Sequence, residues 1–175
     1  MTAPTPTGRH ERRGTDDHLV WERTFRAPID DVWASVTESD RLARWFGTWT
    51  GDPADGFVTV QMNAEGDAAE PSRFEIRACD APTHLAVDVV DEGGAWYLDL
   101  ELRESDGTTT LLLAQRIHDV SIVEHTGPGW EWYLDRLVSA ASGADTDDLD
   151  FDAYLAATHD HYRALQETLT PDNPR

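Results

Sequence analysis

The amino-acid sequence predicts an α+β protein in which a curved antiparallel sheet wraps around one long helix. Three observations support this prediction. Apolar and polar residues alternate with a period of two over much of residues 48–117, short turn sequences separate the alternating segments, and a segment with helical periodicity follows them. Short connections favour antiparallel neighbours. Because one face of such a sheet is apolar over many strands, a helix has to cover it, and curvature leaves a gap between the two.

The N-terminal segment contains almost nothing apolar, so residues 1–17 are predicted to form a disordered tail. Arg9, Arg12 and Arg13 form a small basic cluster in it, which we interpret as part of a solvated tail. The first strand is predicted at His18–Arg26, which alternates weakly and is rich in Val, Trp, Thr and Phe.

Two short helices are predicted after this strand. Pro28 suits the start of the first, because its missing N–H has no partner to lose there. The apolar face of the first helix comprises Ile29, Val32, Trp33 and Val36. Thr37 followed by Asp40 resembles a capping box at the start of the second helix, and Gly47 is predicted to end it. The buried side of the second helix comprises Leu42, Trp45 and Phe46.

Five strands are predicted in the alternating region. They are expected at Phe57–Met62, Arg73–Ala78, Leu85–Val90, Trp96–Arg103 and Thr108–Ile117. In the fourth of these, the even positions from Trp96 to Leu102 are apolar and the odd positions are polar or Tyr, so one face is predicted to be buried and the other at least partly wet. Asp106-Gly107 is typical of a tight hairpin. Further turns are predicted at Asp80–Thr83 and Gly93-Gly94.

The long helix is predicted at Gly129–Gly143, after a Gly127-Pro128-Gly129 turn and before a glycine suited to a left-handed C-terminal cap. Its apolar stripe comprises Trp130, Leu134, Leu137 and Ala141. Helical spacing at Phe151–Leu169 predicts one more helix. The expected organisation is therefore one domain at residues 18–143, followed at residues 144–175 by an acidic linker and an additional helix.

Composition narrows the function classes. The formal net charge is −20, from 14 basic and 34 acidic residues, which argues against nucleic acid and anionic membranes as partners. We attribute the acidity to solubility. The sequence has neither an apolar run of membrane-spanning length nor a secretion signal, so we expect a cytoplasmic protein. Its single cysteine, Cys79, excludes an internal disulfide, and we interpret it as structural.

Several short motifs together resemble the START-like (SRPBCC, Bet v 1-like) superfamily, and within it the Hsp-90 ATPase activator homologue-like group. They are Val20–Phe25, Ala27-Pro28, Val32-Trp33, Leu42-Ala43-Arg44-Trp45-Phe46-Gly47 and Gly129-Trp130 with Leu134 and Leu137. The resemblance covers residues 18–143. It implies a helix-grip fold with an internal cavity for an apolar or amphipathic small molecule. Ser39 departs from the pattern, because many members have proline there, and Phe151–Leu169 extends past the shared core.

An aromatic and apolar set of side chains is the candidate cavity lining. With one histidine, it comprises Trp45, Phe46, Trp49, Met62, Phe74, Trp96, His118, Trp130, Tyr133, Leu134 and Leu137. These residues fit either a ligand cavity under the long helix or plain core packing, because a cavity and a core share walls. Buried Trp and Tyr also need a partner for their polar atom, which favours a cavity for some of them.

Polar residues at the ends of the last strand and the long helix allow a second interpretation. His118 and Asp119 follow the strand, and Glu124 and His125 precede the helix, so either an acid–base pair at the cavity mouth or a polar loop fits. His118 is the histidine to test, because it lies at a strand end near the helix.

No metal site and no cofactor are expected. His159 and His161 are two positions apart on a predicted helix and project to different sides. The sequence contains no phosphate-binding loop, nucleophile elbow or dinucleotide fingerprint.

Three functions follow from these observations. The leading hypothesis is a non-enzymatic module that binds a hydrophobic small molecule. The second, from the family group, is a regulator of a chaperone ATPase. The third is a polyketide cyclase- or dehydratase-like enzyme, which needs an acid–base residue inside the cavity. Because related folds perform all three, the fold alone does not decide between them, and a homodimer also remains open.

Overall fold

The computed structural model describes residues 3–64, 69–92 and 94–171. Over these residues the chain forms one antiparallel sheet of eight strands, four α-helices and two short 3-10 helices. The strands are β1 (Arg9–Arg13), β2 (Asp16–Phe25), β3 (Gly47–Thr50), β4 (Phe57–Met62), β5 (Ser72–Asp80), β6 (His84–Asp91), β7 (Gly94–Ser105) and β8 (Thr108–Arg116). The helices are α1 (Ile29–Thr37), α2 (Ser39–Leu42), η1 (Pro53–Asp55), η2 (Val120–Ile122), α3 (Val123–Ser142) and α4 (Phe151–Leu169).

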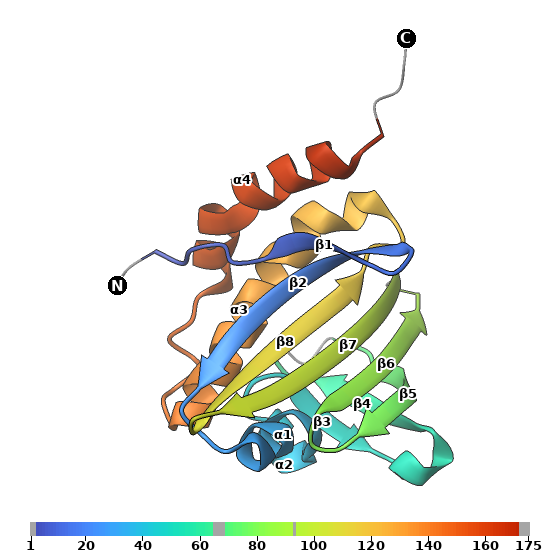
Figure 1. Cartoon of the computed structure of the whole chain (residues 1–175), viewed down its shortest axis with the longest axis vertical. Coiled ribbons are helices and arrows are strands. Elements are labelled where there is room, and N and C mark those ends of the chain that lie inside the picture. Colours follow the sequence, from blue (N-terminus) through green and yellow to red (C-terminus); the bar gives the residue numbers. More distant parts are fainter. Residues whose placement is uncertain (1–2, 65–68, 93, 172–175) are drawn as a thin grey trace.

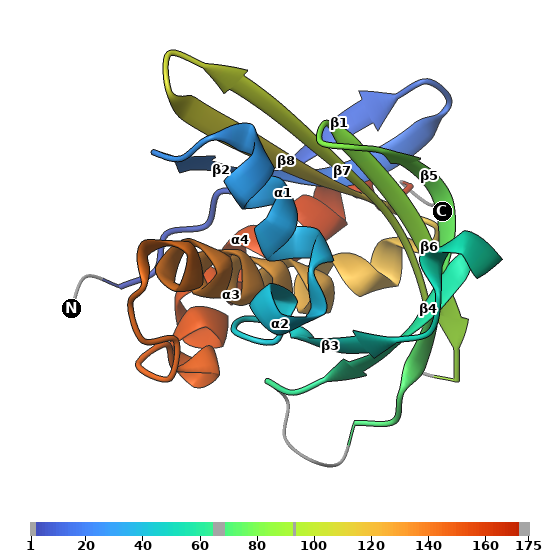
Figure 2. The ribbon, with the colours of Figure 1, turned by 90° about the horizontal axis from the view of Figure 1, so that it is seen from below.

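The sheet is strongly curved and wraps around α3, with α1 and α2 beside that helix (Figures 1 and 2). The strand order is β1-β2-β8-β7-β6-β5-β4-β3, and every neighbouring pair is antiparallel. The core lies between the concave face and α3, where Leu19 and Leu111 of the sheet and Leu137 of the helix are fully buried. This architecture confirms the predicted α+β helix-grip fold.

The predicted β7–β8 hairpin is confirmed. Asp106 and Gly107 have φ angles of 53° and 74°, so both central residues adopt the left-handed conformation that a type I′ turn requires. In β7, Leu98 and Leu102 are buried while Glu101 is exposed, as the alternation predicts. Of the other predicted turns, Asp80–Thr83 is observed, and Gly93 lies outside the described residues.

The second short helix is shorter than predicted. Helix α2 ends at Leu42, Trp45-Phe46 follows in a turn, and Gly47 begins strand β3 instead of ending a helix. A Cβ on Gly47 would overlap the backbone carbonyl oxygen of Gln61 in β4. The close pairing of β3 with β4 therefore requires a glycine at this position.

The predicted capping box at Thr37 and Asp40 is wrong. Thr37 ends α1, and its hydroxyl donates to the carbonyl oxygen of Trp33 at 2.8 Å. Ser39 instead ties α2 to β3, because its Oγ accepts from the backbone N–H of Trp49 at 2.8 Å and donates to the Trp49 carbonyl at 3.1 Å.

The predicted disordered tail is wrong for Arg9–Arg13, which forms the edge strand β1 and pairs with β2. Charged side chains are usual on such an edge, since they discourage pairing with other chains. Arg13, for example, donates to Glu101 at 2.8 Å. Residues 1–2 of the predicted tail and residues 172–175 of the predicted C-terminal segment lie outside the described part of the chain.

Helix α3 begins at Val123, so the predicted turn at Gly127-Pro128-Gly129 is wrong and all three residues are helical. A Cβ on Gly127 would penetrate the ring of Tyr162 in α4. Glycine at position 127 therefore allows α3 and α4 to approach closely and does not form a turn. The predicted C-terminal cap is confirmed, because Gly143 has a φ of 78°.

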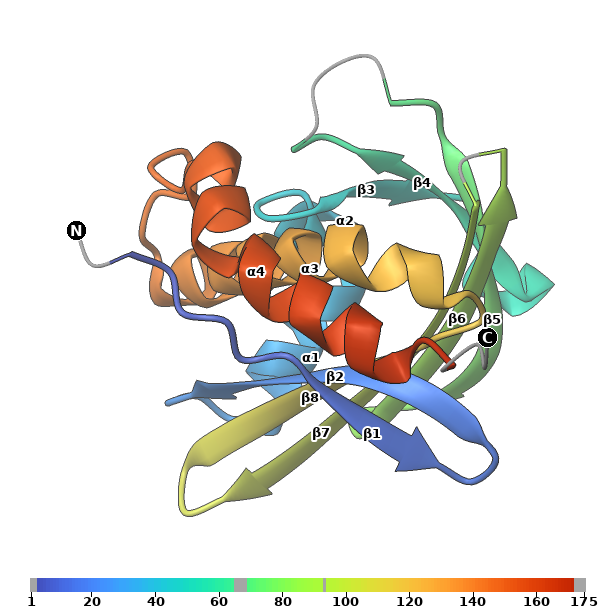
Figure 3. The same ribbon diagram turned by 90° about the horizontal axis from the view of Figure 1, so that it is seen from above.

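Helix α4 matches its predicted range and packs against α3, while the N-terminal segment runs beside it towards β1 (Figure 3). A carboxylate joins these parts. Glu131 of α3 is 1% exposed. It accepts hydrogen bonds from the amides of Thr7 and Gly8, from the Tyr162 hydroxyl, and from Arg23 at 2.8 Å. The same tyrosine oxygen accepts from the indole N–H of Trp21 at 2.8 Å.

This network shifts two pKa values in opposite directions. Burial alone would raise the pKa of Glu131, but the hydrogen bonds from Tyr162, Arg23 and the two amides outweigh it, so this pKa lies below its ordinary value. Burial raises the pKa of Tyr162, and the neighbouring Glu131 charge raises it further.

Stability is expected to fall at alkaline pH because of Tyr162. Its folded-state pKa lies above the unfolded value of about 10, so unfolding releases a proton above that pH. Through this residue the free energy of unfolding should decrease by about 1.4 kcal/mol in total between about pH 9 and pH 11, and by about 1.4 kcal/mol per pH unit above that range. Urea unfolding between about pH 9 and pH 11 would measure the slope. Tyr162→Phe should remove this share of the slope, and an unchanged slope in the variant would contradict the assignment.

Candidate functional site

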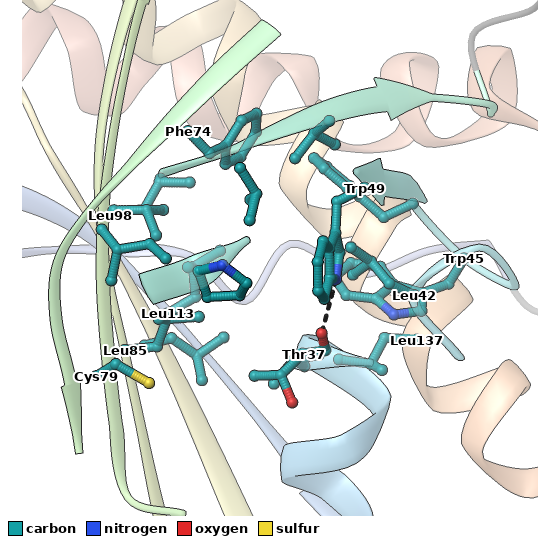
Figure 4. A pocket seen from close by; sticks show the side chains of 18 of the residues that line it. Thr37, Leu42, Trp45, Trp49, Phe74, Cys79, Leu85, Leu98, Leu113 and Leu137 are labelled. Carbon is teal, nitrogen blue, oxygen red and sulfur yellow. Dashed lines mark hydrogen bonds between the residues drawn. The ribbon is translucent and has the colours of Figure 1, made fainter. Parts of the chain in front are cut away.

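A cavity of about 200 Å³ lies between the concave face of the sheet, α1–α2 and α3 (Figure 4). Each element contributes an apolar wall: Val36 from α1, Val87 from β6 and Leu137 from α3 are examples. Seven residues of the predicted set line it, namely Trp45, Phe46, Trp49, Phe74, Trp130, Leu134 and Leu137. Other wall residues were predicted only as members of strands, among them Val58, Ile76, Leu85, Val87 and Leu100.

The indole N–H groups around the cavity already have partners. Trp45 donates to the carbonyl oxygen of Ser35 at 2.9 Å, and Trp49 donates to that of Thr37 at 2.8 Å. Trp130 donates to Oε1 of the fully buried Gln115 at 2.6 Å. These bonds fix the three rings and leave their carbon faces towards the cavity.

Acid–base chemistry has little support at this cavity. Among its described lining residues, none is a His, Asp, Glu or Arg, and the only titratable one is Cys79 at an exposed position. A general acid or base must lie within hydrogen-bonding reach of the reacting group. The cyclase- or dehydratase-like hypothesis requires such a residue, and the described lining of this cavity does not supply one.

A second space, a groove of about 560 Å³, is lined by two other members of the predicted set. Trp96 of β7 and Tyr133 of α3 line this groove and not the cavity. Phe46 and Trp130 line both, with their rings parallel within 4° and their centroids 6.2 Å apart. These two rings therefore form a partition between the cavity and the groove.

Met62 and His118 line neither space. Met62 is a core residue at the end of β4, beside Gly47 of β3. His118 is exposed, and its ring packs edge-on against Tyr97 at 5.6 Å, on the outer face of the sheet. The chain turns just after it, where the Asp119 carboxylate accepts from the Ser121 amide at 2.9 Å. The expectation that His118 enters the cavity is wrong for this reason.

The other three histidines considered in the sequence, His125, His159 and His161, lie outside the cavity. His125 lies 3.4 Å from Glu124 and borders the groove. His161 contacts the carbonyl oxygen of Gly8 at 2.8 Å, while His159 faces Asp160. Within the described ranges, no group of three or more His, Cys, Asp or Glu side chains is arranged to hold a metal ion. No helix in the same ranges is long and apolar enough to cross a membrane.

A curved antiparallel sheet closed by a long helix, with an apolar space between them, defines the class of helix-grip proteins. The sequence model for the family described as activator of Hsp90 ATPase homolog 1-like protein matches residues 26–142. This chain belongs to that family, which confirms the resemblance found in its motifs.

Solved structures share the fold at low sequence identity. CalU16 from Micromonospora echinospora superposes with a TM-score of 0.71 at 22% identity, over 93% of this chain and 96% of that one. EF2215 from Enterococcus faecalis, a conserved protein of unknown function, superposes with a TM-score of 0.70 at 17% identity, over 94% of this chain and 92% of that one. DynU16, a putative protein in the dynemicin biosynthetic locus, superposes with a TM-score of 0.64 at 22% identity, over 75% of this chain and 49% of that one. No curated protein matches the chain in sequence.

Proposed function

We propose that this protein binds an uncharged hydrophobic small molecule in its internal cavity. The observation that carries the proposal is an apolar space between the sheet and the helices whose bordering indole donors are already bonded. Such walls recognise a ligand by burial of apolar surface and shape, without hydrogen bonds.

The cavity volume limits the ligand. An engineered protein cavity of about 150 Å³ accommodates benzene, so about 200 Å³ suits a molecule slightly larger than benzene, such as a short alkylbenzene. A bound apolar molecule would remove its surface and that of the cavity walls from water, which favours binding by about 25 cal/mol per Å² of apolar area buried.

The open side of the cavity lies at Cys79, which is both exposed and part of the lining. A polar head group could reach water there while the apolar part of the ligand stays inside. The proposal therefore includes amphipathic ligands whose head group is near this residue.

A matched pair of substitutions on β6 tests the proposal. Val87→Phe should fill the cavity and weaken binding of the probe n-butylbenzene by at least about 10-fold, because the space is removed. Val90→Phe, the same change at a position that is 68% exposed, should alter affinity by less than about 2-fold. Isothermal titration calorimetry would measure binding, and native mass spectrometry of the purified protein would detect a retained ligand.

Two results would contradict the proposal. One is that n-butylbenzene and comparable apolar probes fail to bind the folded wild-type protein. The other is that Val87→Phe and Val90→Phe bind the probe equally well, because binding would then not use the cavity.

Regulation of a chaperone ATPase is a second candidate, favoured by the family match over residues 26–142. Its test is the ATPase rate of an Hsp90-type chaperone with this protein in excess. An unchanged rate would remove this candidate without affecting the cavity proposal.

A further inference from the structure

The groove beside the cavity has a different chemistry from the cavity itself. Its walls include Trp96 of β7, Trp130, Trp132 and Tyr133 of α3, and Phe151 of α4. The rings are inclined to one another: Trp96 to Trp130 by 65° at 6.2 Å, and Trp132 to Phe151 by 67° at 5.5 Å. Its volume of about 560 Å³ lies within the usual range of small-molecule sites.

A glycine keeps this groove open. A Cβ on Gly129 would meet no neighbouring atom within 4 Å, whereas one on Gly127 would penetrate the Tyr162 ring. Gly129 lies within α3 and has no left-handed φ, so neither packing nor backbone conformation requires a glycine there. Glycine in a helix interior costs about 1 kcal/mol relative to alanine. Local rules are broken mainly at functional or strained sites, and Gly129 does not have the left-handed φ of a strained one.

The charges around the groove favour cationic ligands over anionic ones. Asp150 and Asp152 flank Phe151 in the chain, and the Glu124 carboxylate lies 3.4 Å from the His125 ring at the groove. The whole chain carries a net charge of −20. A field of this sign raises the local concentration of cations and repels anions.

The aromatic walls also suit a cation. Trp132 already has the guanidinium of Arg136 over its ring, 4.7 Å from the centroid. Arg136 is not part of the groove lining and donates to the carbonyl oxygens of Trp45 and Thr146, each at 3.1 Å. Planar cations gain from the ring faces of Trp and Tyr by cation–π attraction and stacking.

We propose that this groove is a second binding site, for a planar aromatic molecule that carries a delocalised positive charge. It is independent of the cavity proposal, because the partition of Phe46 and Trp130 separates the two spaces.

The tricyclic cation 9-aminoacridine is the probe, and 9-anthracenecarboxylate is an anion with a tricyclic ring of the same shape. The cation should bind the wild-type protein with quenching of tryptophan fluorescence. Gly129→Leu should weaken binding by at least about 10-fold, because the new side chain projects into the groove. Gly129→Ala places one methyl group in the groove and should weaken binding by about 2- to 4-fold, while the cavity variant Val87→Phe should change it by less than about 2-fold.

Phe151→Ser provides a second variant, since this ring is 39% exposed and its loss removes one groove wall without opening the core. It should weaken binding of 9-aminoacridine by about 3-fold or more. The proposal is overturned if the cation does not bind wild type, if Gly129→Leu binds it as tightly as wild type, or if the anion binds as tightly as the cation.

Discussion

Replacement of Glu131 by alanine is expected to lower the free energy of unfolding by about 3–5 kcal/mol. The carboxylate is 1% exposed. The amides of Thr7 and Gly8 and the side chains of Arg23 and Tyr162 donate to it. Truncation removes the acceptor of the buried Tyr162 hydroxyl and one of the two carboxylates that pair with Arg23, which keeps only Asp135 at 2.8 Å. Buried donors that lose an acceptor carry an uncompensated desolvation cost.

Urea unfolding followed by tryptophan fluorescence measures this effect. Glu167→Ala is the control, because it is the same change at an exposed helical position, and its effect should stay within about 0.5 kcal/mol. Glu131→Gln keeps the side-chain shape and one acceptor oxygen and should fall between the two. A loss in Glu131→Ala no larger than that in Glu167→Ala would show that the network does not stabilise the fold. If Glu131→Ala does not fold, the glutamine variant supplies the same comparison.

The same network explains why the first strand escaped prediction. β1 has no apolar alternation, because it is an edge strand held by backbone pairing with β2. The residues before it are fixed by Glu131, whose contact with Thr7 spans 124 positions of sequence. Local pattern carries no information about such a partner. The strands β4 to β8 were predictable because their alternation reflects burial on one face, which is a local signal.

The start of α3 shows a second limit. Gly127 and Pro128 are typical of turns, yet both lie inside the helix. What selects glycine at position 127 is the ring of Tyr162, which belongs to another helix. A spacing pattern within one segment does not reveal that a distant side chain needs the room.

The candidate site was predictable as a set of side chains but not as two spaces. Trp130 and Tyr133 both belong to the predicted lining, and in the structure both border the groove while only Trp130 also reaches the cavity. That division depends on the angle between α3 and the sheet, which sequence spacing does not encode. His118 was misplaced because its orientation is set by the turn at Asp119 rather than by the alternation of β8.

The two glycines of α3 should respond very differently to the same substitution. The free energy of unfolding of Gly127→Val is expected to be about 3 kcal/mol lower than that of Gly129→Val. Both changes place valine in the interior of one helix, so the difference in helix propensity cancels between them. At position 127 the added atoms meet the ring of Tyr162, and at position 129 the added Cβ meets open space.

Tyr162 has little freedom to move away from a larger side chain at position 127. It is fully buried, and its hydroxyl is bonded to both Glu131 and Trp21. Relief of the overlap must therefore separate α3 from α4 and stretch the buried network at the same time. Urea unfolding of the two variants would measure the difference. Equal stabilities would show that the α3–α4 contact tolerates a larger residue and that Gly127 has no packing role, whereas a stable Gly129→Val would leave the open groove as the remaining reason for a glycine at that position.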